Sequence, residues 1–327
     1  MERVYSITVV PVGFESLGVR SMCTFVETGD VRILIDAGVA LGPRFGMKPH
    51  PLEYQARAAC RTRIKDYAAK SDIIIISHYH NDHHTPNYTE PVWLGSSAEE
   101  AEQIYCNKTV ILKSIRDSVN LAQRKRGWMF QRFLKTIGSI CQVADGAKFE
   151  FGKTIVRMSE PVPHGEETSG LGWVLMTTIE SEQTKIMHAS DVQGPMSKRT
   201  TSAILEQKPD LLLLGGPPFY LEKVKVSTKA LNEGVANAIK IARKVPTVIF
   251  EHHALRSEKW IEDIKPIQDA GDEVNYTVIT AAEYLGLKSN TLEPMRQQLY
   301  EAHPPSKSFL EWCALDREKQ RQTAPPI

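Results

Sequence analysis

Short runs of apolar residues, many of them β-branched, alternate along the chain with polar and glycine-rich segments. Val, Ile and aromatic residues fit a pleated, half-buried surface, so these runs predict β-strands. The uninterrupted run Ile73–Ile76 predicts a strand that is buried on both faces. Strands are also predicted in residues 3–12, 23–28, 31–35, 92–94, 109–112, 147–159, 172–180, 183–188, 210–214, 247–251 and, at a sheet edge, 275–279.

Longer segments with helical periodicity lie between these runs and predict amphipathic helices. These helices are expected in residues 53–70, 98–106, 114–126, 128–137, 197–207, 228–244, 293–302 and 306–319. Strands that alternate with helices in this way indicate a mixed α/β chain. Two loops rich in Gly and Pro, 42–51 and 215–220, are expected to border a pocket, with Phe219 and Tyr220 in its wall.

Metal-binding side chains directly follow the isoleucine strand. His78, His80, Asp82, His83 and His84 fall within seven residues, where the chain leaves the strand. His78 and His80 point the same way if the chain is still extended, so they can share one metal ion. Imidazole and carboxylate groups are ligands that Zn²⁺, Fe and Mn²⁺ accept. The string therefore predicts a metal site, and the alternative is a surface loop that is rich in histidine.

The string His78-x-His80-x-Asp82-His83 resembles the signature of the metallo-β-lactamase superfamily. The resemblance extends over roughly residues 3–285 and implies an α/β (α+β) fold, a four-layer αββα sandwich with the metals at one edge between two sheets. Residues 1–327 are then expected to form a single domain with a helical cap insertion at about 96–139 and a helical C-terminal tail from about 290.

Three later positions match weaker parts of the superfamily pattern, in the correct order. The resemblance implies two ligand sets joined by a bridging carboxylate: His78, His80 and His164 for one metal, Asp82, His83 and His252 for the other, and Asp191 between them. His253 stays open as an alternative to His252 because successive residues of a strand face opposite ways. Asp36 is interpreted as a carboxylate that supports the site, and His188 as a packing or hydrogen-bonding residue.

The resemblance implies a metal-dependent hydrolase that uses a hydroxide bridging two divalent ions, with Zn favoured and Fe or Mn also compatible. Asp82 would orient the hydroxide or accept its proton. His84 would meet the leaving group, anchor Asp36 or only hydrogen-bond within its loop. The expected substrate is a phosphodiester or another anionic ester. A lactone or thioester hydrolase, a mononuclear-iron dioxygenase and a non-catalytic metal- or nucleic-acid-binding protein are the alternatives.

Composition narrows these classes only slightly. The 327 residues carry 40 basic and 39 acidic side chains, so the whole chain indicates neither a nucleic-acid-binding nor a membrane protein. Residues 108–135 are locally basic with interleaved aromatics. One interpretation is a cap that attracts an anionic substrate, either a small molecule or a nucleic acid. The other is an amphipathic helix pair whose charges are solvated. Scattered cysteines and the absence of a signal-like start or membrane span indicate a cytoplasmic protein.

Overall fold

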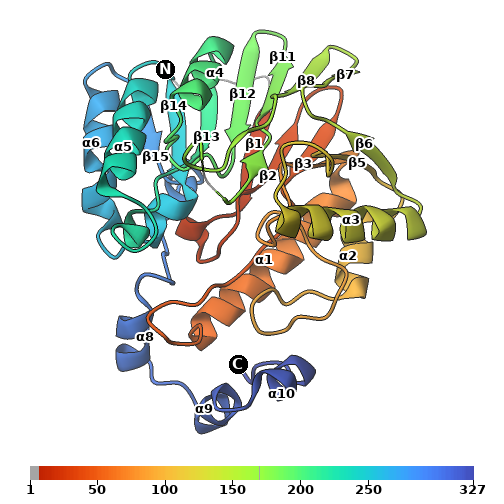
Figure 1. Cartoon of the computed structure of the whole chain (residues 1–327), viewed down its shortest axis with the longest axis vertical. Coiled ribbons are helices and arrows are strands. Elements are labelled where there is room, and N and C mark those ends of the chain that lie inside the picture. Colours follow the sequence, from red (N-terminus) through yellow and green to blue (C-terminus); the bar gives the residue numbers. More distant parts are fainter. Residues whose placement is uncertain (1–6, 169) are drawn as a thin grey trace.

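Two mixed β-sheets pack face to face, and helices cover the outer side of each, which makes a four-layer αββα sandwich (Figure 1). The computed structural model describes residues 7–168 and 170–327. Most of the strand predicted in residues 3–12 is present, but its residues 3–6 lie outside the described residues. The predicted α/β sandwich is confirmed.

The N-terminal sheet has the order β1-β2-β3-β4-β5-β6 within the described residues. Its strands are β1 (Thr8–Gly13), β2 (Cys23–Glu27), β3 (Arg32–Ile35), β4 (Ile73–Ile76), β5 (Thr109–Leu112) and β6 (Ile140–Val143). The first three strands are antiparallel neighbours, and the pairs from β3 to β6 are parallel. Strand β6, at the edge, was not predicted from the sequence.

The C-terminal sheet has the order β15-β14-β13-β12-β11-β8-β7 in the same part of the chain. Its strands are β7 (Lys148–Phe151), β8 (Thr154–Met158), β11 (Thr177–Ser181), β12 (Thr184–Ala189), β13 (Leu211–Gly215), β14 (Thr247–Glu251) and β15 (Thr277–Ile279). Strands β12 to β15 pair in parallel, so their carboxyl ends meet at one edge. A separate pair, β9 (Val162–Pro163) and β10 (Trp173–Val174), adjoins that edge.

Alternation along the buried strands divides the core into layers. In β4, Ile73 and Ile75 enter the core between the sheets, whereas the cluster that contains Ile74 and Ile76 includes side chains of the covering helices. In β13, Leu211 and Leu213 likewise face the other sheet. Because side chains of a strand alternate between faces, a run that is apolar at every position must be covered on both sides.

Helices cover both outer faces. On the N-terminal sheet lie α1 (Pro51–Lys70), α2 (Ala98–Tyr105) and α3 (Leu121–Thr136), and on the C-terminal sheet lie α4 (Lys198–Gln207), α5 (Thr228–Ala242) and α6 (Trp260–Asp272). The remaining α-helices of the described chain are α7 (Ala281–Tyr284), α8 (Arg296–Ala302), α9 (Lys307–Cys313) and α10 (Arg317–Gln322). None of these helices is both long and apolar enough to cross a bilayer.

The C-terminal helices lie against the beginning of α1 (Figure 1). The ring of Tyr54 contacts Phe309 and Trp312, with ring centroids 5.9 Å apart in each case. Arg296 is fully buried and donates two hydrogen bonds of 2.7 Å to the carboxylate of Glu53. The tail is thus attached by an aromatic cluster and a buried ion pair.

One predicted strand, residues 92–94, is wrong, because this segment forms a turn. Its backbone polar groups are satisfied by side chains instead of a sheet. Arg57 donates to the carbonyls of Pro91 and Val92, and the Glu90 carboxylate accepts from the amides of Trp93 and Leu94. A buried backbone needs partners, but the sequence does not reveal that side chains supply them.

Two helix boundaries also differ from the prediction. Residues 114–126 and 128–137 were expected to form two helices, but a single helix, α3, runs through Gly127. A Cβ atom at Gly127 would lie 2.6 Å from atoms of Tyr79 and Ile115, so glycine serves close packing here. Conversely, the helix expected in residues 306–319 is divided into α9 and α10, because Asp316 caps the second of them.

Candidate metal centre

The loop after β4 is held by a buried carboxylate, Asp36. Its oxygens accept hydrogen bonds from the Ser77 amide and hydroxyl, at 2.8 and 2.7 Å, and bond Nδ1 of His83 at 2.8 Å. The loop approaches so closely that a Cβ atom on Gly38 would lie 2.3 Å from the amide nitrogen of His84. Asp36 therefore holds the His83 ring through Nδ1 and leaves Nε2 free to face the candidate centre, which agrees with its interpretation as a supporting carboxylate.

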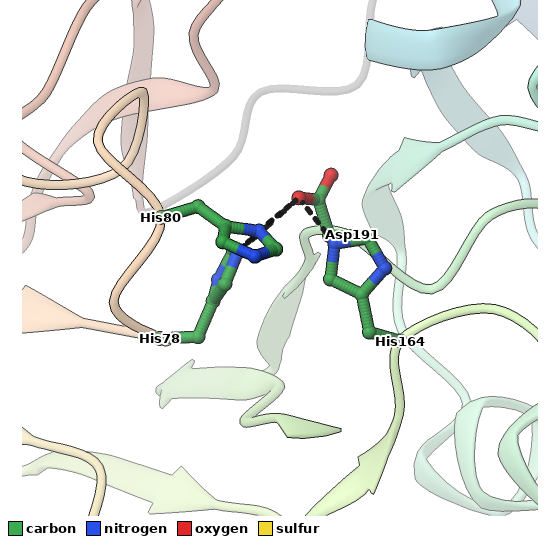
Figure 2. Close-up of side chains that lie close together, drawn as sticks. All are labelled: His78, His80, His164 and Asp191. Carbon is green, nitrogen blue, oxygen red and sulfur yellow. Dashed lines mark hydrogen bonds and ion pairs between the residues drawn. The ribbon is translucent and has the colours of Figure 1, made fainter. Parts of the chain in front are cut away.

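A first group of donors lies where this loop meets the C-terminal sheet. Figure 2 shows His78 and His80 on one side and His164 and Asp191 on the other, all directed at one point. Asp191 Oδ2 lies 3.2 Å from His78 Nε2, 3.7 Å from His80 Nδ1 and 2.9 Å from His164 Nε2. The four donor atoms lie within 4.8 Å of one another.

A second group of donors, Asp82, His83 and His252, also lies next to Asp191. Nε2 of His252 lies 2.6 Å from Asp191 Oδ1, and Nε2 of His83 lies 3.3 Å from Asp191 Oδ2. Asp82 is 3.9 Å from His83 Nε2 and 3.8 Å from His252 Nε2. The structure thus brings together all seven side chains of the predicted ligand sets, although their role as ligands stays a prediction.

The chemistry of these groups fits divalent cations. His78 Nε2 and His80 Nδ1 face each other at 3.0 Å, where both cannot carry a proton. Nε2 of His83 is buried and makes no hydrogen bond among the described residues, although oxygens of Asp191 and Asp82 lie 3.3 and 3.9 Å away. Buried polar atoms usually find hydrogen-bond partners, so an unpaired one among converging donors points to a cation as its partner. Nitrogen and carboxylate donors suit Zn²⁺, Fe and Mn²⁺ alike.

His252 is aimed by a strained backbone and by a carboxylate that the sequence did not indicate. It follows β14 with a positive φ of 61°, a conformation that is uncommon for a non-glycine residue. Its Nδ1 lies 3.0 Å from a carboxylate oxygen of Glu15, which also accepts a 2.8 Å hydrogen bond from Nε of Arg256. Glu15 sits in the loop after β1, 237 residues away in sequence, and no local pattern marks it.

Buried carboxylates set the electrostatic potential of the centre. Burial alone would raise the pKa of Asp191, but His252 and His83 hold that pKa well below its usual range. Burial alone would lower the pKa of His252, but Asp191 and Glu15 raise it to about 9. Asp191 and Asp82 likewise raise the pKa of His83 well above its ordinary value against the effect of burial. A potential that attracts protons to imidazoles also favours a divalent cation at the same place.

Two further histidines of the motif region differ in placement. His253 Nε2 is 3.6 Å from Asp191 Oδ1, but its ring stacks on Tyr220 and borders the pocket, so His252 fits the second group better. His84 is not among the residues that line the pocket, and its role at the leaving group stays a prediction. Its Nδ1 bonds the His80 carbonyl at 2.9 Å, its ring packs on Phe130, and burial lowers its pKa to about 4.

His188 bonds the Met22 carbonyl through Nε2 at 2.9 Å, which agrees with the hydrogen-bonding role expected for it. Of the loop predicted to form a pocket wall, Tyr220 lines the pocket, whereas Phe219 packs against the core of the C-terminal sheet.

Relatives of known sequence identify the family. A UPF0282 protein of Methanopyrus kandleri is 39% identical over 292 residues, which span 89% of this chain and 98% of that protein. Another, from Thermococcus kodakarensis, is 40% identical over 294 residues, 89% of this chain and 95% of that protein. The chain belongs to the UPF0282 family. No family model matches the sequence.

Solved structures resemble this UPF0282 protein in fold. A mutant of the β-hydroxylase CmlA aligns with a TM-score of 0.50 at 13% identity, over 85% of this chain and 53% of that one. The metallo-β-lactamase fold protein YhfI of Bacillus subtilis aligns with a TM-score of 0.48 at 13% identity, over 84% and 95% of the two chains. The likeness is one of fold, and the αββα layers with a His/Asp motif at their edge agree with the metallo-β-lactamase fold that the motif indicated.

The UPF0282 chain surrounds its candidate centre with a pocket of about 600 Å³. Loops from both halves of the sandwich contribute to its walls, and four of the seven candidate donors, His80, Asp82, His164 and Asp191, line it. The lining side chains include His80, Asp82, Tyr220, His253 and Arg256. Segment 96–139, expected as a cap, contributes no lining residue; α2 and α3 pack on the outer face of the N-terminal sheet instead.

Proposed function

We propose that this protein is a metal-dependent hydrolase that binds two divalent cations and cleaves an anionic ester, with a phosphodiester as the favoured substrate. The single observation that carries the proposal is the arrangement of two donor groups around one buried carboxylate, that of Asp191. When bound, a pair of divalent cations supplies Lewis acidity and makes water a nucleophile at neutral pH. Zn²⁺ is the favoured metal, and Fe or Mn²⁺ fit the same donors.

The protein residues then have separate tasks. Asp82 borders the pocket, and the charges of His83 and His252 hold its pKa well below the usual range despite burial, so it is a carboxylate. An ionised carboxylate at that position orients a water molecule and accepts its proton. His253 faces the pocket with Nδ1 3.1 Å from the Tyr220 hydroxyl, and this pair is within reach of a leaving group.

Cationic side chains in the pocket support the choice of an anionic substrate. Arg20, Arg256 and Lys225 line it, while Glu166 is an exposed acidic residue at its rim. Arg20 and Arg256 are partly neutralised by Glu293 and Glu15, which fixes their positions. The lining holds three basic side chains and three acidic ones, Asp82, Glu166 and Asp191, so the charge of two bound cations would make the pocket positive and favour a phosphate over a neutral ester.

The test combines metal analysis with two chromogenic substrates. We expect protein purified without chelator to contain about two divalent ions per chain and to hydrolyse bis(p-nitrophenyl) phosphate faster than p-nitrophenyl acetate. Chelation should remove activity and added Zn²⁺ or Mn²⁺ should restore it. His80→Ala should abolish turnover with little loss of stability, because the His80 side chain is 22% exposed. His303→Ala, at an exposed histidine that does not line the pocket, is the matched control.

Three outcomes would contradict the proposal in different ways. Preferential cleavage of the acetate would indicate a neutral ester as substrate. No hydrolysis of either compound by metal-loaded protein would favour a non-catalytic metal protein or an oxygen-dependent reaction. Loss of the folded state in His80→Ala, followed by circular dichroism, would mean that the residue is structural.

A further inference from the structure

The outer face of α3 presents basic and apolar side chains to solvent. Leu121, Lys125, Trp128, Arg132 and Lys135 recur at intervals of three or four residues, so they share one side of the helix. All five are exposed, Leu121 by 80% and Trp128 by 49%. The opposite side packs on the N-terminal sheet, and in Figure 1 the helix lies at the right-hand edge of the molecule. We call these five residues the α3 face.

The charge of this helix is unbalanced. Residues 121–136 hold five basic and no acidic side chains, whereas the whole chain holds 40 basic and 39 acidic ones. Within residues 7–168 and 170–327, no carboxylate forms an ion pair with Lys125, Arg132 or Lys135. Nε of Arg126, on the same helix, likewise has no hydrogen-bond partner in this part of the chain. Concentrated, uncompensated positive charge attracts a polyanion.

An aromatic platform accompanies the charge. The Arg132 guanidinium lies 4.7 Å from the centroid of the Trp128 ring, a cation–π contact at the surface. Beside it is a hollow of about 310 Å³, lined by Trp128, Met129, Arg132 and Phe133 among others. Cations that contact phosphates and an exposed indole that stacks on bases are the two components of single-strand recognition.

We propose that the α3 face binds single-stranded nucleic acid. The first turn of α3 is bonded to a residue of the pocket wall, although none of the five residues of the α3 face lines the pocket. Asn120 Nδ2 and Gln123 Nε2 donate to the Leu171 carbonyl, at 2.8 and 2.7 Å, and Leu171 lines the pocket. The N-terminal end of the α3 face, at Leu121, therefore lies next to the pocket wall in the chain and in space. That the bound nucleic acid is also the substrate rests on the proposed function, whereas the binding itself does not.

The experiment measures binding of fluorescein-labelled 12-mers of oligo(U) and oligo(dT) by anisotropy, over a range of salt concentrations. In Lys125→Gln/Arg132→Gln the slope of log affinity against log salt should fall by about 1.4, since each single-strand phosphate contact contributes about 0.7. Trp128→Ala should weaken binding by about 5- to 150-fold, and Trp128→Phe should retain most of it, because stacking on one base is sensitive to loss of the ring.

A charge-matched control uses α5, on the outer face of the other sheet. Lys229 and Lys240 are exposed there, and Lys229→Gln/Lys240→Gln should leave the affinity unchanged. Equal weakening in both double variants, or no binding at low salt, would overturn the proposal. Equal affinity for a duplex would refute the stacking component, and equal competition by polyglutamate would indicate an acidic protein partner. Retained binding in His80→Ala, with hydrolysis lost, separates this surface from the proposed activity.

Discussion

The carboxylate of Glu15 offers the sharpest test of how the second donor group is held. Glu15 is 5% exposed and lies close to two cationic partners: Nδ1 of His252 at 3.0 Å and Nη2 of Arg256 at 2.7 Å. Glu15→Gln keeps the shape of the side chain and removes its charge. The ring of His252 then loses the anion that orients it and raises its basicity as a ligand.

The expected loss of metal affinity follows from the usual effect of a carboxylate that hydrogen-bonds a ligating histidine. A carboxylate behind a ligating histidine typically contributes a factor of about 10 to 100 in metal affinity, or about 1.4–2.8 kcal/mol. The loss should be confined to the cation held by Asp82, His83 and His252, because the other group has no contact with Glu15. Arg256 loses its closer anionic partner, Glu15, and keeps only Asp82, at 3.5 Å. A loss of fold stability is therefore also expected and must be measured separately.

The assay is competition with a chromogenic chelator, which resolves two binding steps. We expect one step to weaken by about 10- to 100-fold and the other to stay unchanged, and Glu262→Gln, an exposed change on α6, to affect neither. Thermal unfolding in the presence of chelator reports the stability of the metal-free protein. Equal weakening of both steps, or unchanged affinity in a folded Glu15→Gln protein, would refute the reasoning.

Three further predictions concern stability and metal loading. Arg296→Met leaves the buried carboxylate of Glu53 without its cation and should destabilise the protein by about 3–5 kcal/mol in urea unfolding, whereas adding Glu53→Gln should recover part of the loss. Gly38→Ala, whose Cβ would lie 2.3 Å from the His84 amide nitrogen, should displace the histidine loop, and isothermal titration should then show weakened binding of both cations. Removal of metal by a chelator should lower the melting temperature of the wild-type protein, and adding Zn²⁺ should raise it again, since an ion bound only by the folded state stabilises that state. An unchanged melting temperature would contradict the metal assignment.

The parts of the fold that were predicted correctly have strong local signals. Strand β4 is a continuous apolar run, and β5 and β14 have the predicted bounds. The errors lie where contacts with distant residues override the structure that the local sequence pattern predicts. Residues 92–94 are apolar and strand-like, but Arg57 and Glu90 satisfy their backbone in a turn. Gly127 suggested an interruption, but contact with Tyr79 makes it part of one helix.

The candidate site divides in the same way. Residue types and spacing singled out His78, His80, Asp82 and His83, because clustered donors after a strand have few other uses. Whether His84 belongs with them depends on which way its side chain leaves the loop, and packing against Phe130 turns it away from the pocket. Glu15 carries no motif and could not be found before the chain was folded.

The sequence by itself determined most strands and helices and the donor cluster His78, His80, Asp82 and His83, because hydrophobic periodicity and ligand type are local properties, whereas the family resemblance supplied the three later donors. Only the tertiary structure decided which carboxylate stands behind which imidazole, that Asp191 lies between two donor groups, and that α3 faces solvent rather than the pocket. These features depend on contacts between residues that lie from 27 to 237 positions apart, and the meeting of two sheet edges, rather than any neighbour in sequence, fixes such contacts.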